Sequence, residues 1–214
     1  MVRSLAYLAL ISACLLIGIA CGSRPDTDTV DIVQALSGGE TDCYSQADRP
    51  MDFKFPKDFG AHDNFKTEWW YYTGDVSDAG GRHFGFQLTF FRQALACDIP
   101  EGESQWRSRQ LFFAHFAVTD TRNSVFYSAR RMNRASVGIA GAGAAPFKVW
   151  LDDWTAAGAG EKSGSVKLQA RDQDSSGAGF FSINLSLERD KPIVRQGIDG
   201  WSRKGPGTSD ASYY

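Results

Sequence analysis

The chain of 214 residues has few of the side chains that build metal and nucleophile sites. It contains three histidines, widely spaced, and four cysteines. It also lacks a Gly-x-Ser-x-Gly elbow, a phosphate-binding glycine loop, and the Cys-x-x-Cys and His-Glu-x-x-His metal signatures. We therefore expect no metal ion and no other cofactor, and no motif identifies a serine hydrolase.

A strong charge of one sign and a long apolar run are also absent. The formal net charge is -2, which gives no electrostatic reason to expect nucleic acid as a partner. The apolar run over residues 5–20 is shorter than the roughly 20 residues that a membrane-spanning helix needs. It follows Arg3 and ends at the polar residues after Cys21, so we expect a cleaved export signal over residues 1–20.

The residues around Cys21 predict where the exported chain is held. Ile19-Ala20-Cys21-Gly22 is similar to a bacterial lipoprotein processing site, where an acylated Cys21 would anchor the protein to a membrane. The alternative is an ordinary cleaved signal and a secreted protein. Residues 21–50 are polar and predict a tether. Cys43 and Cys97 are then the remaining thiols, and they either form a disulfide or stay unpaired.

Aromatic residues, which make up 13% of the chain, and 22 glycines favour short strands joined by tight turns. The stretch 67–91 predicts a β-hairpin whose first arm places Trp69 and Tyr71 on one face and Trp70 and Tyr72 on the other. The Gly- and Ala-rich stretch 136–145 is expected to be a loop. Further alternating segments predict strands over residues 110–120, 124–130, 147–152, 166–170 and 181–187. The fold class is therefore all-β, as an antiparallel up-and-down barrel or a strongly curved sandwich.

Several ordered blocks carry a resemblance to a known family. They are Phe59-Gly60-Ala61-His62, Lys66-Thr67-Glu68-Trp69-Trp70-Tyr71-Tyr72-Thr73-Gly74, Phe86-Gln87-Leu88-Thr89-Phe90-Phe91-Arg92 and Ala114-His115-Phe116-Ala117-Val118-Thr119-Asp120. Together they resemble the carotenoid 1,2-hydratase (hydroxyneurosporene synthase) superfamily, which includes lipocalin-like AttH-type proteins often labelled secreted hydrolases.

The resemblance implies two lipocalin-like β domains side by side, with this chain supplying the first. Residues 51–196 would form that domain, and residues 197–214 would form the crossover and a truncated start of the second. The family's hydratases are associated with a His-x-Trp and a Tyr-x-Asp pattern in the second half, and neither pattern occurs here. No family catalytic residue can therefore be carried over to this chain.

Hydration of an isoprenoid double bond requires a proton donor and surroundings that tolerate a transient cation. Glu68 is the first candidate acid because it shares a strand face with two aromatic residues, and His115 is the second. Asp120, Asp152 and Asp153 are further candidates. Each has a structural alternative. Glu68 is solvated at the barrel rim or paired with Lys66 or Arg92, His115 belongs to the core, Asp120 caps a turn, and Asp152 and Asp153 form a strand end in water.

The sequence thus predicts an exported lipocalin-like protein that binds a hydrophobic, isoprenoid-like molecule. Two functions stay open, hydration of a double bond and non-catalytic carriage by a membrane-tethered lipoprotein, with a structural lipoprotein of filled core as a third possibility. The sequence decides neither whether the chain is an enzyme nor its oligomeric state. The predicted ligand contacts are Trp69, Trp70, Tyr71, Tyr72, Phe91 and Phe113.

Overall fold

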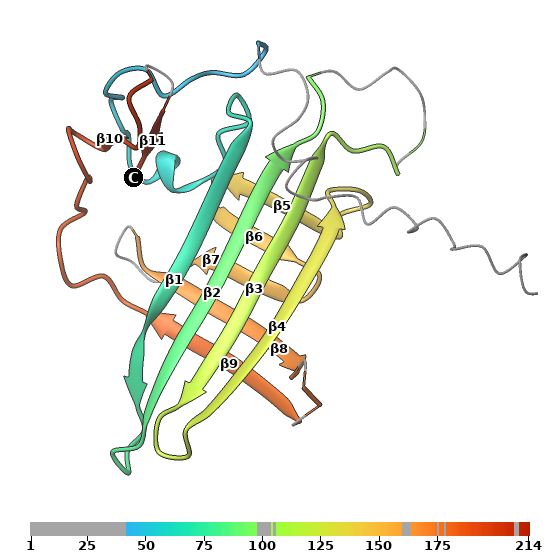
Figure 1. The fold of residues 1–214 in the computed structure, drawn as a ribbon, viewed down its shortest axis with the longest axis vertical. Helices are drawn as coiled ribbons and strands as arrows, with labels where there is room; N and C mark the ends of the chain where they lie inside the picture. The colour runs from blue at the N-terminus through green and yellow to red at the C-terminus, as the bar shows by residue number, and fades with distance from the viewer. Residues whose placement is uncertain are drawn as a thin grey trace, which may run out of the picture. The chain divides into compact units, whose positions relative to one another are not determined.

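The structure, a computed structural model, describes residues 42–97, 104, 106–159, 164–174, 176–177, 179–207 and 210–214. This part of the chain is built of strands with one short 3-10 helix (Figure 1). The elements are η1 (Lys57–Phe59), β1 (Thr67–Ser77), β2 (His83–Ala94), β3 (Gln110–Asp120), β4 (Val125–Arg134), β5 (Ala140–Ala144), β6 (Phe147–Leu151), β7 (Trp154–Gly158), β8 (Val166–Gln173), β9 (Phe180–Leu187), β10 (Trp201–Arg203) and β11 (Ala211–Tyr213).

The strands form two antiparallel meanders that pack face to face. The first sheet has the order β1-β2-β3-β4 and the second the order β5-β6-β7-β8-β9. Figure 1 shows the strands of the second sheet running across behind those of the first. Both sheets are open, so the all-β prediction is confirmed and the arrangement is a lipocalin-like sandwich and not a closed barrel.

The first hairpin forms as the sequence predicts. Its arms pair from Thr67 with Gln93 to Ser77 with His83. In the turn, the Asp78 carboxylate accepts hydrogen bonds from two backbone N–H groups, at 2.8 and 2.9 Å. Gly81 takes a φ of 74°, a conformation that glycine adopts without a steric penalty.

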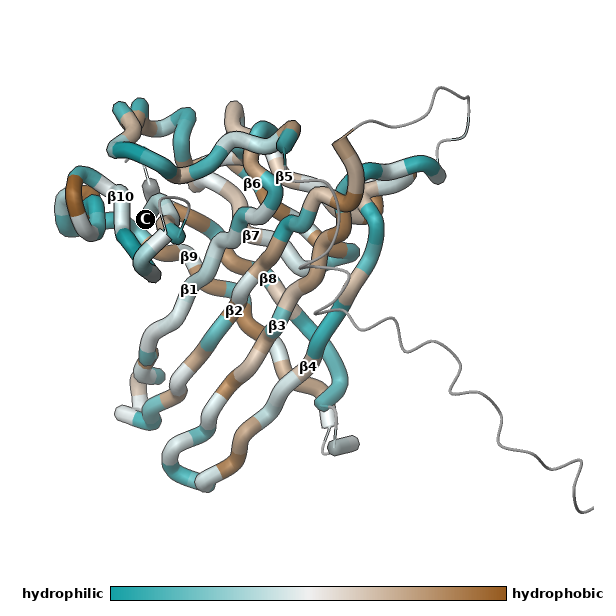
Figure 2. Tube along the Cα trace, turned by 45° about the horizontal axis from the view of Figure 1, so that its top comes forward, coloured by the Kyte–Doolittle hydropathy of each residue, from teal (hydrophilic) through white to brown (hydrophobic). Residues whose placement is uncertain are grey.

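The core lies between the two sheets and is largely aromatic. Inward-facing residues of β2 and β3 meet those of the second sheet, and hydrophobic residues recur along the strands of both sheets in Figure 2. Phe116 stacks on Phe181 with ring centroids 4.5 Å apart and meets Trp154 edge-on at 5.5 Å. Such ring pairs add about 0.5–1.5 kcal/mol each beyond the area they bury.

The prediction of a loop over residues 136–145 is wrong, because residues Ala140–Ala144 form strand β5. Gly141 pairs with Trp150, and a Cβ at Gly141 would lie 2.6 Å from the indole ring. The missing side chain therefore makes room for the Trp150 ring across the strand pair. A second strand that the sequence did not predict, β7, follows the turn at Asp152 and Asp153.

The segment before η1 is attached to the hairpin of β10 and β11. The Ala47 carbonyl accepts a hydrogen bond from Trp201 Nε1 at 2.7 Å, and the Arg49 carbonyl accepts one from the Tyr213 hydroxyl at 2.8 Å. Cys43 is joined to Cys97, just beyond β2, by a disulfide with a Cα–Cα distance of 5.9 Å. Residues 43–50, which the sequence placed in a tether, thus form a strap across one end of the sandwich.

Candidate functional site

A cleft of about 660 Å³ lies at the strapped end of the sandwich. Its walls are the start of β1, the segment 53–65 that precedes it, residues 193–195, and β11 with the adjoining Tyr214. Because β1 is the edge strand of its sheet, side chains from both of its faces reach the cleft. The strap closes it further with Ser45, Gln46 and Ala47.

Six rings follow one another around the cleft, and we call them the aromatic chain. Neighbouring centroids lie 4.6–6.5 Å apart, within or near the usual range for aromatic contacts. The segment before β1 supplies five of the rings and β11 the sixth. In order of contact they are Phe59, Phe55, Phe53, Tyr213, Phe65 and His62.

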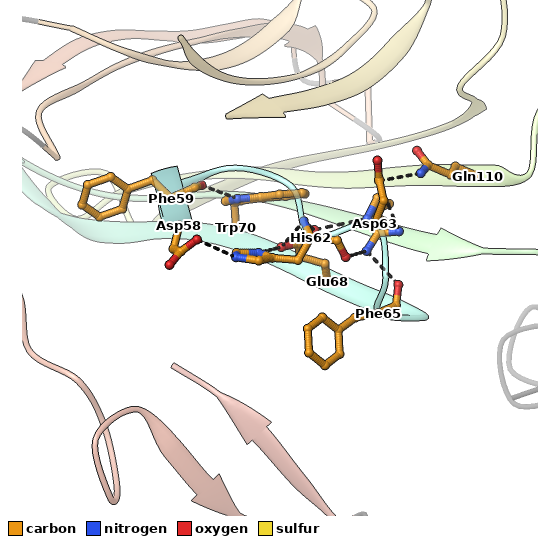
Figure 3. Close-up of polar contacts among 9 residues, drawn as sticks. Asp58, Phe59, His62, Asp63, Phe65, Glu68, Trp70 and Gln110 are labelled. Atoms are coloured by element: carbon orange, nitrogen blue, oxygen red, sulfur yellow. Dashed lines mark hydrogen bonds and ion pairs between the residues drawn. The ribbon is translucent and has the colours of Figure 1, made fainter. Parts of the chain in front are cut away.

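His62 ends the aromatic chain and lies between two carboxylates (Figure 3). Its Nδ1 lies 2.7 Å from Glu68 Oε1, and its Nε2 lies 3.3 Å from Asp58 Oδ1. Since a carboxylate only accepts, the imidazolium satisfies both contacts by donating from both nitrogens. The hydrogen bond to Glu68, and then the charges of both carboxylates, outweigh desolvation and raise the pKa of His62 above 6.5.

Arg92, fully buried, fixes the back of this cluster. Its Nε donates to Glu68 Oε2 at 3.2 Å, and its Nη2 donates to the carbonyls of His62 and Phe65, both at 2.9 Å. Its Nη1 is a buried donor without a hydrogen-bond partner and lies 3.9 Å from Asp63 Oδ1. The guanidinium therefore ties the loop 62–65 to β1 and orients the Glu68 carboxylate.

Close packing positions the segment that carries η1. The backbone at Gly60 passes so near β5 that an added Cβ would lie 2.3 Å from Ala144 Cα. Trp70 Nε1 donates to the Phe59 carbonyl at 3.0 Å, which ties the same segment to β1. These contacts hold Asp58 and His62 over the inner face of β1.

The four aromatic residues of β1 are divided between the cleft and the core. Trp69, Trp70 and Tyr71 line the cleft, and Trp69 contacts Tyr214 edge-on with centroids 5.5 Å apart. Tyr72 packs against the core between the sheets, and burial raises its pKa. The strand thus serves as both cleft wall and core.

Phe91 and Phe113 lie elsewhere, on the face of the first sheet that points away from the second sheet. They are cross-strand neighbours and stack at 4.5 Å. Trp69 of β1 pairs with Phe91, and Met132 of β4 pairs with Phe113, so one row of apolar side chains crosses all four strands. The structure does not bring the six predicted ligand contacts together in one cavity.

The second predicted acid, His115, also lies on this outer face. It pairs with Thr89 and Arg130, is exposed, and does not share the cleft with Glu68. Desolvation and then the Arg130 charge lower its pKa.

The three aspartates lie at turns: Asp120 is the last residue of β3, and Asp152 and Asp153 are in the turn after β6. Asp120 accepts a hydrogen bond from Asn123 N at 3.2 Å and is paired with Arg82, whose guanidinium holds the pKa of Asp120 below its usual range. Asp152 and Asp153 form the turn before β7 and face Arg131. None of the three lines the cleft.

The sequence places Glu68 next to aromatic surface and offers Arg92 as an ion-pair partner, a contact that the structure shows. It gives no sign of His62 beside Glu68 or of Asp58 on the far side of His62. In the sequence, the block Phe59-Gly60-Ala61-His62 carries a family resemblance but no pattern that pairs His62 with Glu68. The available signal is the position of His62, which lies six residues before Glu68 in the loop that precedes the strand.

The predicted signal and Cys21 lie outside the described residues. No helix in the described ranges is long and apolar enough to cross a membrane. Among those same residues there is also no group of His, Cys, Asp and Glu side chains placed to hold a metal ion.

An open sandwich of two antiparallel meanders, with an aromatic cleft at one end, defines a lipocalin-like β protein. The family model described as AttH-like matches residues 46–214. A crystal structure of a protein from Nitrosomonas europaea that is assigned to AttH is 34% identical to the chain, with a TM-score of 0.63. The chain therefore belongs to the AttH-like family, within the lipocalin-like superfamily related to carotenoid hydratases.

The match with the Nitrosomonas europaea structure covers 76% of this chain and 46% of the solved one. The chain thus spans about half the length of that relative. Among curated proteins there is no significant match.

Proposed function

We propose that this protein binds an apolar, isoprenoid-like small molecule in the cleft beside β1 and acts as its carrier. The observation that supports this proposal is a cleft of about 660 Å³ ringed by the aromatic chain. The volume lies in the usual range of small-molecule sites, roughly 300–1,000 Å³, and such sites combine apolar walls with a few polar groups.

Binding is better supported than hydration of a double bond. An acid that protonates an alkene must hold a proton at neutral pH and lose it readily. Glu68 accepts hydrogen bonds from His62 Nδ1, His62 N and Arg92 Nε, so its oxygens act as acceptors and not as a proton source. The raised pKa of His62 makes its imidazolium form a weaker acid than a free imidazolium.

The proposal includes export and a membrane anchor. The apolar run over residues 5–20 and the lipoprotein-like site at Cys21 support it. The disulfide between Cys43 and Cys97 agrees with an oxidising compartment. Labelling of cells with a radioactive fatty acid tests the anchor: the wild-type protein should take up label, and Cys21→Ser should not. An unlabelled wild type would exclude lipidation.

Tryptophan fluorescence tests ligand binding, because Trp69 and Trp70 line the cleft. Titration with farnesol, a linear isoprenoid alcohol, should give saturable quenching. Phe65→Ala, in the aromatic chain, should weaken binding about fivefold or more, since it removes a large apolar contact.

The matched control is Phe113→Ala, which removes a ring of the same size from the outer face of the first sheet. We expect it to leave farnesol binding unchanged. If Phe113→Ala weakened binding and Phe65→Ala did not, the apolar row on the outer face would be the binding surface and the proposed site would be wrong. Quenching that never saturates would refute binding altogether.

A further inference from the structure

The aromatic wall of the cleft is interrupted by the polar cluster of His62, Asp58 and Glu68. We propose, on the basis of the proposed function, that the cleft selects apolar ligands that carry a hydroxyl group. His62 Nε2 and Asp58 Oδ1 recognise this group together, as one donor and one acceptor.

The hydrogen bonds within the cluster decide which polar atoms a ligand can reach. Both Glu68 oxygens are engaged, Oε1 by His62 Nδ1 at 2.7 Å and Oε2 by His62 N at 3.0 Å and Arg92 Nε at 3.2 Å. Asp58 Oδ2 accepts a hydrogen bond from Lys54 N at 2.5 Å. The contact between His62 Nε2 and Asp58 Oδ1 is the longest of the set at 3.3 Å, beyond the usual length of a strong hydrogen bond.

That long contact is therefore the one that a ligand can share. The side chains of His62 and Asp58 are 23% and 12% exposed, so both reach the cleft surface while most of each is held by the protein. Aromatic residues flank the pair on the cleft side, because Phe59 adjoins Asp58 in the chain and the ring centroids of Phe65 and His62 lie 6.5 Å apart. A ligand chain packed on these rings would bring its end group to the polar pair.

The chemistry of the pair selects the end group. A hydroxyl both accepts and donates, so it can accept from Nε2–H and donate to Oδ1. An aldehyde can only accept and satisfies half of the pair. A hydrocarbon satisfies neither group and removes water from both, which is unfavourable. A carboxylate accepts from His62 but lies against the negative charges of Asp58 and Glu68.

The test is a series of four compounds with one isoprenoid skeleton: farnesol, farnesal, farnesoic acid and farnesene. Their affinities for the full chain are measured by tryptophan quenching at pH 7. Farnesol should bind about tenfold more tightly than farnesene, as expected for a hydrogen bond that involves charged groups, with farnesal between them. Farnesoic acid should bind more weakly than farnesol.

Two variants locate the effect. His62→Phe keeps a ring at the end of the aromatic chain, and it should reduce farnesol affinity to that of farnesene. Asp58→Asn is nearly isosteric, removes one negative charge, and should bring farnesoic acid closer to farnesol. The matched control His115→Phe, on the outer face, should leave every ratio unchanged.

The outcomes separate this inference from the proposed function. Saturable binding of all four compounds with equal affinity overturns the hydroxyl selection and leaves the carrier function intact. Tighter binding of farnesoic acid than of farnesol also overturns it, because the cluster would then be an anion site. If none of the four compounds binds, the carrier function and the hydroxyl selection both fail.

Discussion

The strap over residues 43–50 depends on the disulfide between Cys43 and Cys97, so replacing both cysteines by serine should destabilise the protein and loosen the cleft. The two cysteines are 54 residues apart in sequence. A closed loop of about 55 residues corresponds to roughly 4 kcal/mol of chain entropy in the unfolded state. With a urea m-value of about 2 kcal/mol/M, the unfolding midpoint should fall by roughly 2 M.

The effect on the cleft has a separate cause. Without the disulfide, the strap is still held by the hydrogen bonds from Trp201 to Ala47 and from Tyr213 to Arg49. Each contributes only about 1 kcal/mol net, so the strap opens more often and farnesol should bind more weakly.

Urea unfolding followed by tryptophan fluorescence measures the first effect, and farnesol titration measures the second. The control is reduction with dithiothreitol, which should lower the midpoint of the wild type to that of the double variant and leave the variant unchanged. A double variant with an unchanged midpoint, or a wild type that reduction does not affect, would refute the reasoning.

Three further predictions concern the groups that hold the cleft together. Gly60→Ala should lower the free energy of unfolding by about 1–3 kcal/mol, because the new Cβ would lie 2.4 Å from Ala144 Cβ. The control Gly85→Ala, whose new Cβ would have its nearest contact at 3.6 Å, should be close to neutral. Equal shifts of the two variants in thermal denaturation would contradict this. Arg92→Met should cost about 3–5 kcal/mol in urea unfolding, since a buried carboxylate and two carbonyls lose their donor, and a loss below about 1 kcal/mol would count against the assigned contacts. The raised pKa of His62 means that its stabilising contribution is complete below pH 6.5 and is lost as the pH rises through the higher pKa of the folded state. Melting temperatures measured across this range should fall more steeply for the wild type than for His62→Gln, and parallel profiles would show that the ion pairs contribute nothing.

The sheets could be predicted from sequence where side chains alternate in size and polarity. The hairpin of β1 and β2 has strong strand formers and a glycine turn, so local preferences and the final fold agree. Strand β5 could not be predicted in this way, because alanine and glycine have little tendency to form strands. It forms because Gly141 accommodates the Trp150 ring and Gly60 packs on Ala144, and these contacts join residues distant in the chain.

The site was only partly predictable for a related reason. The period of a strand placed Glu68 beside Trp70, and the structure puts both at the cleft. The alternation of side chains along a strand does not say which segment covers each face of the sheet. Phe91 and Phe113 are therefore predicted as ligand contacts together with Trp69 and Trp70, although they do not line the cleft. His62, which contacts Glu68, comes from the irregular loop before β1, whose path is set by hydrogen bonds to Arg92 of β2 and not by any repeating pattern.

The order in which the chain is connected has a consequence for the cleft. Each sheet is a meander of consecutive strands, so either can assemble from neighbouring residues. The cleft instead requires Ala47 to meet Trp201, 154 positions later, and Arg49 to meet Tyr213, 164 positions later. Such distant segments should join last during folding and separate first under mild denaturant. A bound ligand would stabilise their contact, so it should slow amide hydrogen exchange at both segments while exchange in the sheets stays unchanged.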